Sequence, residues 1–109
     1  MLKRGDVYYV IPHNGRNGNT GYPAVILSDG DLNYNKRVNA VQLTLFPRGL
    51  LSSDVVVEAT GTPSVARCAV LQAIPVEWIG DFIGECTDEE MCDISNAVAR
   101  SLGLKQYGY

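Results

Sequence analysis

The sequence contains 109 residues with 46% hydrophobic and 19% charged side chains, a balance that excludes a disordered chain and suits one domain with one core. The formal net charge of −3 argues against general nucleic-acid binding, although seven of the nine basic side chains precede residue 76 and could form a local anion-binding face. No apolar run is long enough to span a bilayer, and no apolar signal segment follows the basic N-terminus, so we expect a cytoplasmic protein without membrane contact.

The cysteines and the single histidine predict neither a disulfide framework nor a metal site. Cys68, Cys86 and Cys92 are odd in number and form no CxxC pair, and His13 is the only histidine that could join them. We therefore expect reduced thiols and no cofactor. Cys68 has no neighbouring histidine to activate it, which predicts a buried, unreactive thiol. His13 is a general base only on paper, because it falls in a polar loop.

The first three quarters of the chain read as short strands separated by turns rich in Gly, Asn, Asp, Ser and Pro. The strands are expected at residues 6–11, 22–27, 38–45, 54–59, 67–74 and 81–85. Between them lie long polar loops at 12–21 and 28–36, turns at 47–49 and 60–63, and a one-turn helix at 75–79.

Near the C-terminus the spacing of apolar residues changes from that of strands to that of a helix. Residues 87–90 read Thr-Asp-Glu-Glu and predict a capping box at the start of this helix. Gly103 is expected to end that helix. Its apolar face is predicted to hold Met91, Ile94, Val98 and Leu102. The fold class is therefore mainly β with α: a single domain, residues 1–109, in which a small, strongly bent antiparallel sheet or barrel carries a C-terminal amphipathic helix.

Four segments, taken in chain order, resemble the MazF/PemK toxin family: KRGDVYY (3–9), PAVILS (23–28), AVQLT (40–44) and CTDEEMCDISNAVARSLGL (86–104). The resemblance implies an SH3-like barrel that forms a homodimer. It also implies a metal-independent endoribonuclease of a type II toxin–antitoxin system that cuts single-stranded RNA. The implied protein partner is an antitoxin whose disordered tail fills the RNA groove.

The resemblance assigns the chemistry mainly to an arginine before the proline of strand two and to the Thr or Ser that ends strand three. Thr44 matches the second position, although a strand-end threonine can equally pack its methyl group and bond its hydroxyl to backbone. Tyr22 stands where the arginine is expected. A tyrosine with a pKa near 10 is neutral at pH 7, and losing one oxyanion-type contact costs about 10²–10³ in rate. Tyr22 is also compatible with a packing or base-stacking role.

Two other arginines are candidates to replace the missing one. Arg16 lies six residues earlier in the polar loop, where it also reads as a solvated charge. Arg67 lies on a predicted strand, where it also reads as a surface ion pair with Glu58. The run Cys-Ala-Val at 68–70 stands where the family commonly has Cys-Glu-Gln, so an acidic or amide side chain is missing there.

The predicted RNA-binding residues are Arg67 and the remaining candidates, Lys36, Arg37 and Tyr9. Lys36 and Arg37 precede strand three and could steer or bind backbone phosphates. Tyr9 could stack on a base, and strand alternation puts Tyr8 and Tyr9 on opposite faces.

The departure at Tyr22 leaves three functions open. The first is an endoribonuclease toxin that is attenuated or uses a displaced arginine. The second is a non-catalytic MazF-like protein that binds RNA or an antitoxin. The third is a toxin directed at DNA gyrase, because toxins of the CcdB type share this fold.

Overall fold

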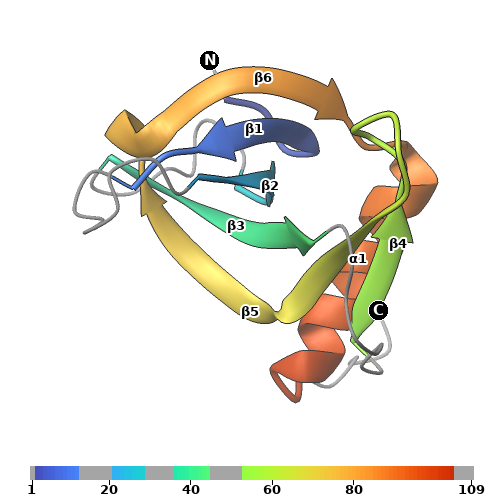
Figure 1. The fold of residues 1–109 in the computed structure, drawn as a ribbon. Coiled ribbons are helices and arrows are strands. Elements are labelled where there is room, and N and C mark those ends of the chain that lie inside the picture. The colour runs from blue at the N-terminus through green and yellow to red at the C-terminus, as the bar shows by residue number, and fades with distance from the viewer. Residues whose placement is uncertain (1, 13–20, 29–35, 45–52, 105–109) are drawn as a thin grey trace.

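The computed structural model describes residues 2–12, 21–28, 36–44 and 53–104, which form one bent antiparallel sheet and one helix (Figure 1). The strands are β1 (Asp6–Val10), β2 (Tyr22–Ile26), β3 (Arg37–Thr44), β4 (Asp54–Val57), β5 (Ser64–Pro75) and β6 (Ile79–Glu85). Their order across the sheet is β4-β5-β3-β2-β1-β6, and every pair is antiparallel. No helix within these ranges is long and apolar enough to cross a membrane.

The central strand β3 is buried on both of its faces, which explains its mixed apolar pattern. Val41 and Leu43 belong to a first core cluster that also contains Ile94 of the helix. Val38 and Ala40 alternate with them and belong to a second core cluster on the other face. The sheet therefore separates two apolar layers, and an even-numbered residue of β3 faces the second cluster.

The bend of the sheet is concentrated in β5, the longest strand. Val41 of β3 pairs with Leu71, whereas Leu43 pairs with Ala66, so two steps along β3 correspond to five along β5. Extra residues of this kind form a β-bulge, which bends a strand and increases its twist. β5 therefore pairs with β3 on both sides of the bulge, at Val65 and Ala66 and again from Leu71 to Pro75, and still turns to meet β4.

The curled sheet brings β6 close to the segment that follows β4. A methyl group added at Gly84 of β6 would overlap the carbonyl oxygen of Ala59, so glycine is required for this approach. Within the described residues β4 and β6 pair only with β5 and β1, respectively, so the sheet is barrel-like in curvature but open in its hydrogen bonding.

The helix α1 (Asp88–Ser101) packs on β4 and β5 (Figure 1). Its capping box is confirmed, because Thr87 accepts from the Glu90 backbone N–H and the Glu90 carboxylate accepts from the Thr87 backbone N–H. Ile94 is buried as expected. The prediction for Leu102 is wrong: its side chain is 54% exposed, because it follows the last helical turn, beyond the residues packed on the sheet.

The predicted strand ends agree with the structure to within two residues, except that β5 begins at Ser64 rather than 67. Two ends differ by two residues: β4 ends at Val57 rather than 59, and β6 begins at Ile79 rather than 81. The predicted one-turn helix is the 3-10 helix η2 (Val76–Trp78). The turn at 47–49 and most of the two polar loops lie outside the described residues.

Candidate functional site

Tyr22 and Thr44 stand at the same end of two neighbouring strands. The register of β2 and β3 pairs Ala24 with Gln42, and Tyr22 and Thr44 each lie two positions beyond that last pair. Both side chains are half-buried. The two positions that the family resemblance singled out are therefore brought to one face and one end of the sheet.

The Thr44 hydroxyl is not engaged by another described residue, since no hydrogen bond joins it to one. Thr44 pairs with Val65 of β5, so its side chain lies between β2 and β5 on this face. A hydroxyl carries one donor and two acceptor lone pairs. Thr44 can therefore donate to a phosphate oxygen without giving up a contact to the described part of the fold.

Tyr22 is held by an amide rather than left open toward a ligand. Its hydroxyl donates to Oε1 of Gln72 at 2.7 Å, and its side chain packs against the second core cluster. Burial raises the pKa of Tyr22 above its ordinary value of 10.0, so the phenol is neutral at physiological pH. While its proton serves Gln72, Tyr22 cannot also donate to a phosphate, and it supplies no positive charge.

Gln72 is the residue that sequence reasoning missed. The family pattern places an acidic or amide side chain at 69–70. In this structure the amide is that of Gln72, which lies two residues further along β5 and opposite Ala40. The sequence contains a signal for this residue, because Gln72 is the only polar side chain between Cys68 and Glu77. A polar residue two positions before the buried Ile74 is expected to share its face.

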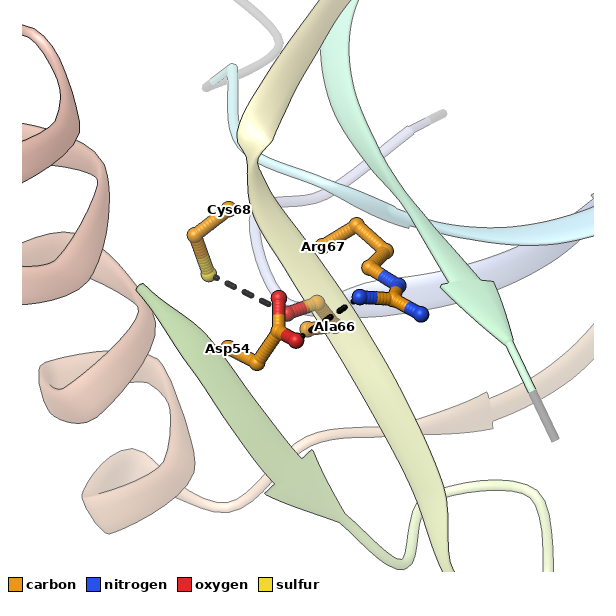
Figure 2. Close-up of polar contacts among 4 residues, drawn as sticks. All are labelled: Asp54, Ala66, Arg67 and Cys68. Carbon is orange, nitrogen blue, oxygen red and sulfur yellow. Dashed lines mark hydrogen bonds and ion pairs between the residues drawn. The ribbon is translucent and has the colours of Figure 1, made fainter. Parts of the chain in front are cut away.

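Arg67 forms an ion pair with Asp54, the residue opposite it on β4, with 2.8 Å between Nη1 and Oδ2 (Figure 2). The prediction that Glu58 is the ion-pair partner of Arg67 is wrong. β4 ends at Val57, so Glu58 lies beyond the paired region, and its backbone N–H donates to the Glu90 carboxylate.

Arg67 lies on the Thr44 side of the sheet. Its neighbours Ala66 and Cys68 point into the first core cluster beneath α1, so alternation turns Arg67 the other way. Figure 2 shows its side chain on the side of β5 away from α1, extending toward β3. Val65, which shares this face with Arg67, is the partner of Thr44.

Lys36 and Arg37 are exposed at the opposite end of β3 from Thr44. Seven steps separate Arg37 from Thr44, which is about 23 Å along the strand. Alternation also puts Arg37 on the face of Val41 rather than that of Thr44. The two cations border a pocket of about 530 Å³ that is further lined by Pro75, Val76 and Glu77. The structure does not bring them together with Thr44.

Tyr9 is 38% exposed on β1, and its ring lies so close to Gly21 that a methyl group there would overlap it. The predicted alternation is confirmed, since Tyr8 instead packs edge-on against Phe82 with 5.5 Å between ring centroids. Tyr9 therefore occupies the face opposite to Tyr22. The candidates Arg16 and His13 lie outside the described residues.

Cys68 is a buried thiol that donates to the Ala66 carbonyl oxygen at 3.6 Å. Burial, reinforced by the negative charge of Asp54 and opposed by Arg100, raises the pKa of Cys68 from 9.0 to about 11. The expected burial is confirmed, and the raised pKa keeps the thiol protonated at neutral pH. Among the described residues no group of three or more His, Cys, Asp or Glu side chains could hold a metal ion.

Comparison with solved structures finds the same fold over almost the whole chain. An endoribonuclease in complex with its cognate antitoxin from a Mycobacterial species is 26% identical, with a TM-score of 0.81 over 98% of this chain and 100% of that one. The Mycobacterium tuberculosis toxin MazF-mt6 is 22% identical, with a TM-score of 0.76 over 93% and 99%. A MazE–MazF complex from Deinococcus radiodurans is 15% identical, with a TM-score of 0.81 over 95% and 98%. A search among curated proteins returned no match.

The sequence profile of one family matches residues 3–102, which include every described strand and the helix. The match agrees with the fold of the solved toxins. It also agrees with the four sequence segments whose order along the chain suggested the family. The chain belongs to the family of PemK-like, MazF-like toxins of type II toxin–antitoxin systems.

Proposed function

We propose that this chain is an endoribonuclease toxin that cuts single-stranded RNA without a metal ion. Family membership and the 26% identical Mycobacterial endoribonuclease support this class of activity. The observation that carries the proposal is the placement of positions 22 and 44 at the same end of β2 and β3, on the side of the sheet away from the core cluster that contains α1 residues.

Cleavage of RNA without a metal requires removal of a proton from the 2′-hydroxyl, delivery of a proton to the leaving 5′-oxygen, and stabilisation of the phosphorane. In this proposal Thr44 donates a hydrogen bond to a phosphate oxygen. Tyr22 has a structural role, because its hydroxyl donates to Gln72, and it contributes no charge. A cation must therefore come from another position.

The proposed protein partner is an antitoxin whose disordered tail occupies the RNA-binding face, and the proposed assembly is a homodimer. The support is that two of the structures with this fold were solved as toxin–antitoxin complexes. An extended tail without its own core can cover a long groove and compete with RNA for it.

A non-catalytic relative that binds RNA or an antitoxin remains the alternative, and the Tyr22–Gln72 hydrogen bond favours it. That bond consumes the only proton that position 22 could offer to a phosphate. The two functions differ in one observable, which is whether RNA is cut.

The test is incubation of a long single-stranded RNA with purified protein in EDTA. The wild type, Thr44→Ala, Tyr22→Arg and the control Thr62→Ala, which makes the same change in an exposed turn, are run side by side. Discrete cuts by the wild type and Thr62→Ala but not by Thr44→Ala support the endoribonuclease. A silent wild type alongside an active Tyr22→Arg supports the binding protein.

A further inference from the structure

We propose that Arg67 supplies the phosphate contact that position 22 lacks, and that Asp54 is the positioning residue that aims its guanidinium across the Thr44 face. The inference rests on the proposed function and deepens it, because it names the cation of the site.

The geometry of the pair suits an arginine that is fixed at one side and open at the other. The Asp54 side chain is 1% exposed and the Arg67 side chain 24% exposed, with 2.8 Å between their polar atoms (Figure 2). A guanidinium has five N–H donors in a planar fork. Because the ion pair uses Nη1, the remaining nitrogens retain enough donors for two parallel bonds to a phosphate.

Arg67 stands within reach of the position that Thr44 faces. Thr44 pairs with Val65, so Arg67, two residues further along β5, is its diagonal cross-strand neighbour. Diagonal neighbours are about 7–8 Å apart, a separation that long side chains bridge. Arg67 is also the first residue after the regular register ends at Ala66, and bulges of this kind re-aim side chains next to active sites.

The other described cations lie elsewhere. Besides Arg67, the basic side chains in the described ranges are Lys3, Arg4, Lys36, Arg37 and Arg100. Arg4 donates to the Leu27 carbonyl oxygen and bonds Ser95, and Lys3 lies beside it, near the far end of β2. Lys36 and Arg37 are at the far end of β3, and Arg100 is on α1. Within the described part of the chain, Arg67 alone shares both the end and the face of Thr44.

The role predicts a specific order among variants in the RNA cleavage assay. Arg67→Gln is expected to lower kcat by about 10²-fold, as loss of an oxyanion donor does, whereas Arg67→Lys keeps the charge but loses the fork and falls in between. Asp54→Asn keeps an oxygen that can accept from Arg67 and loses the charge that orients it, so kcat falls less than in Arg67→Gln. Lys3→Gln removes one exposed charge near the far end of β2 and serves as the matched control.

Destabilisation is separated from function in two ways. Arg67→Gln removes the Arg67 charge from the buried Asp54 carboxylate, so the double variant Asp54→Asn with Arg67→Gln, which removes both charges, is measured beside it. An arginine restored at position 22 should make Arg67 dispensable, so Tyr22→Arg with Arg67→Gln is expected to recover cleavage. A purely structural ion pair would not be rescued from position 22.

Two outcomes overturn the proposal without touching the proposed function. One is an Arg67→Gln variant that cuts at the wild-type rate while Thr44→Ala does not cut. The other is a loss of cleavage by Arg67→Gln that the double variant with Asp54→Asn fully restores, because then only the change in charge balance at Asp54 mattered.

An inactive wild type would overturn the proposed endoribonuclease, and binding then decides the role of Arg67. The affinity for a single-stranded RNA is measured by fluorescence anisotropy over a series of salt concentrations. Loss of one phosphate contact is expected to reduce the slope of log K against log salt by about 0.7 in Arg67→Gln and to leave it unchanged in Lys3→Gln. Equal slopes for the wild type and Arg67→Gln would exclude the phosphate contact.

Discussion

The two ends of β3 carry different kinds of side chain. At its start, Lys36 and Arg37 are exposed cations at the rim of a wide pocket. At its end, Thr44 is half-buried beside a neutral tyrosine whose hydroxyl is already bonded. Exposed charges attract a polyanion at long range but discriminate little, whereas ordered polar groups act only on what touches them. Under the proposed function, the comparison assigns attraction of RNA to one end of β3 and chemistry on RNA to the other.

Removal of the Thr44 hydroxyl should give the largest effect and sharpen this comparison. Thr44→Ala is expected to lower kcat for RNA cleavage by about 10²–10³ with little change in KM, because the hydroxyl acts on the phosphorane more than on bound substrate. Steady-state kinetics on a short RNA measures both constants. A rise in KM at unchanged kcat would instead place Thr44 among the binding residues.

Removal of the charges at the other end should change binding and leave chemistry alone. In the Lys36→Asn, Arg37→Gln double variant the salt slope for RNA binding should fall by about 1.4, that is, two contacts at about 0.7 each. Asn suits position 36 because the backbone there has a left-handed φ of 59°. Saturating RNA should restore the wild-type kcat. A kcat that stays low at saturation would break the division between the two ends.

The hydrogen bond between Tyr22 and Gln72 should contribute a smaller amount, to folding. Gln72→Leu leaves the half-buried phenol without its partner and is expected to lower the free energy of unfolding by about 1 kcal/mol. The cycle that combines it with Tyr22→Phe isolates the coupling between the two side chains. Urea denaturation of the four proteins measures it, and a coupling near zero would mean that the bond does not hold Tyr22 in place.

At neutral pH the smallest effect is expected from Cys68, on the α1 face, because its contribution to stability changes only at high pH. Its pKa is raised to about 11 in the folded protein, from 9.0 for the ordinary thiol. Between these values the unfolded chain has lost the proton that the folded chain retains, so stability falls as pH rises from about 9 to 11. Urea midpoints of the wild type across this range should decline more steeply than those of Cys68→Ala. Parallel declines would assign the loss to other groups.

Local signals in the sequence were sufficient for most elements. The capping box at Thr87, the alternation of Tyr8 and Tyr9, and the short helix before β6 each depend on residues a few positions apart. The partner of Arg67 could not be found in this way. Whether Asp54 or Glu58 lies opposite it depends on where β4 ends and how the turn at 60–63 joins the strands.

Gln72 and Leu102 show the same limit at longer range. The contact of Gln72 with Tyr22 spans 50 positions and crosses β3, so no local period reports it. Leu102 continues the helical period of Ile94 and Val98, but α1 ends at Ser101 and the Leu102 side chain is exposed. In both cases the sequence pattern was correct and the tertiary neighbour decided the outcome.

The register shift in β5 has a consequence for parity. Arg67 and Gln72 are five positions apart, and in an unbroken strand an odd separation would send them to opposite sides of the sheet. The offset between Ala66 and Leu71 reverses odd and even, so both residues serve the face of Thr44 and Tyr22. Deletion of Ala69 alone would shorten the separation to four residues, and a regular strand would then keep both side chains on one face without the reversal. The expected cost of that deletion is the bend of β5 rather than the placement of Arg67 or Gln72.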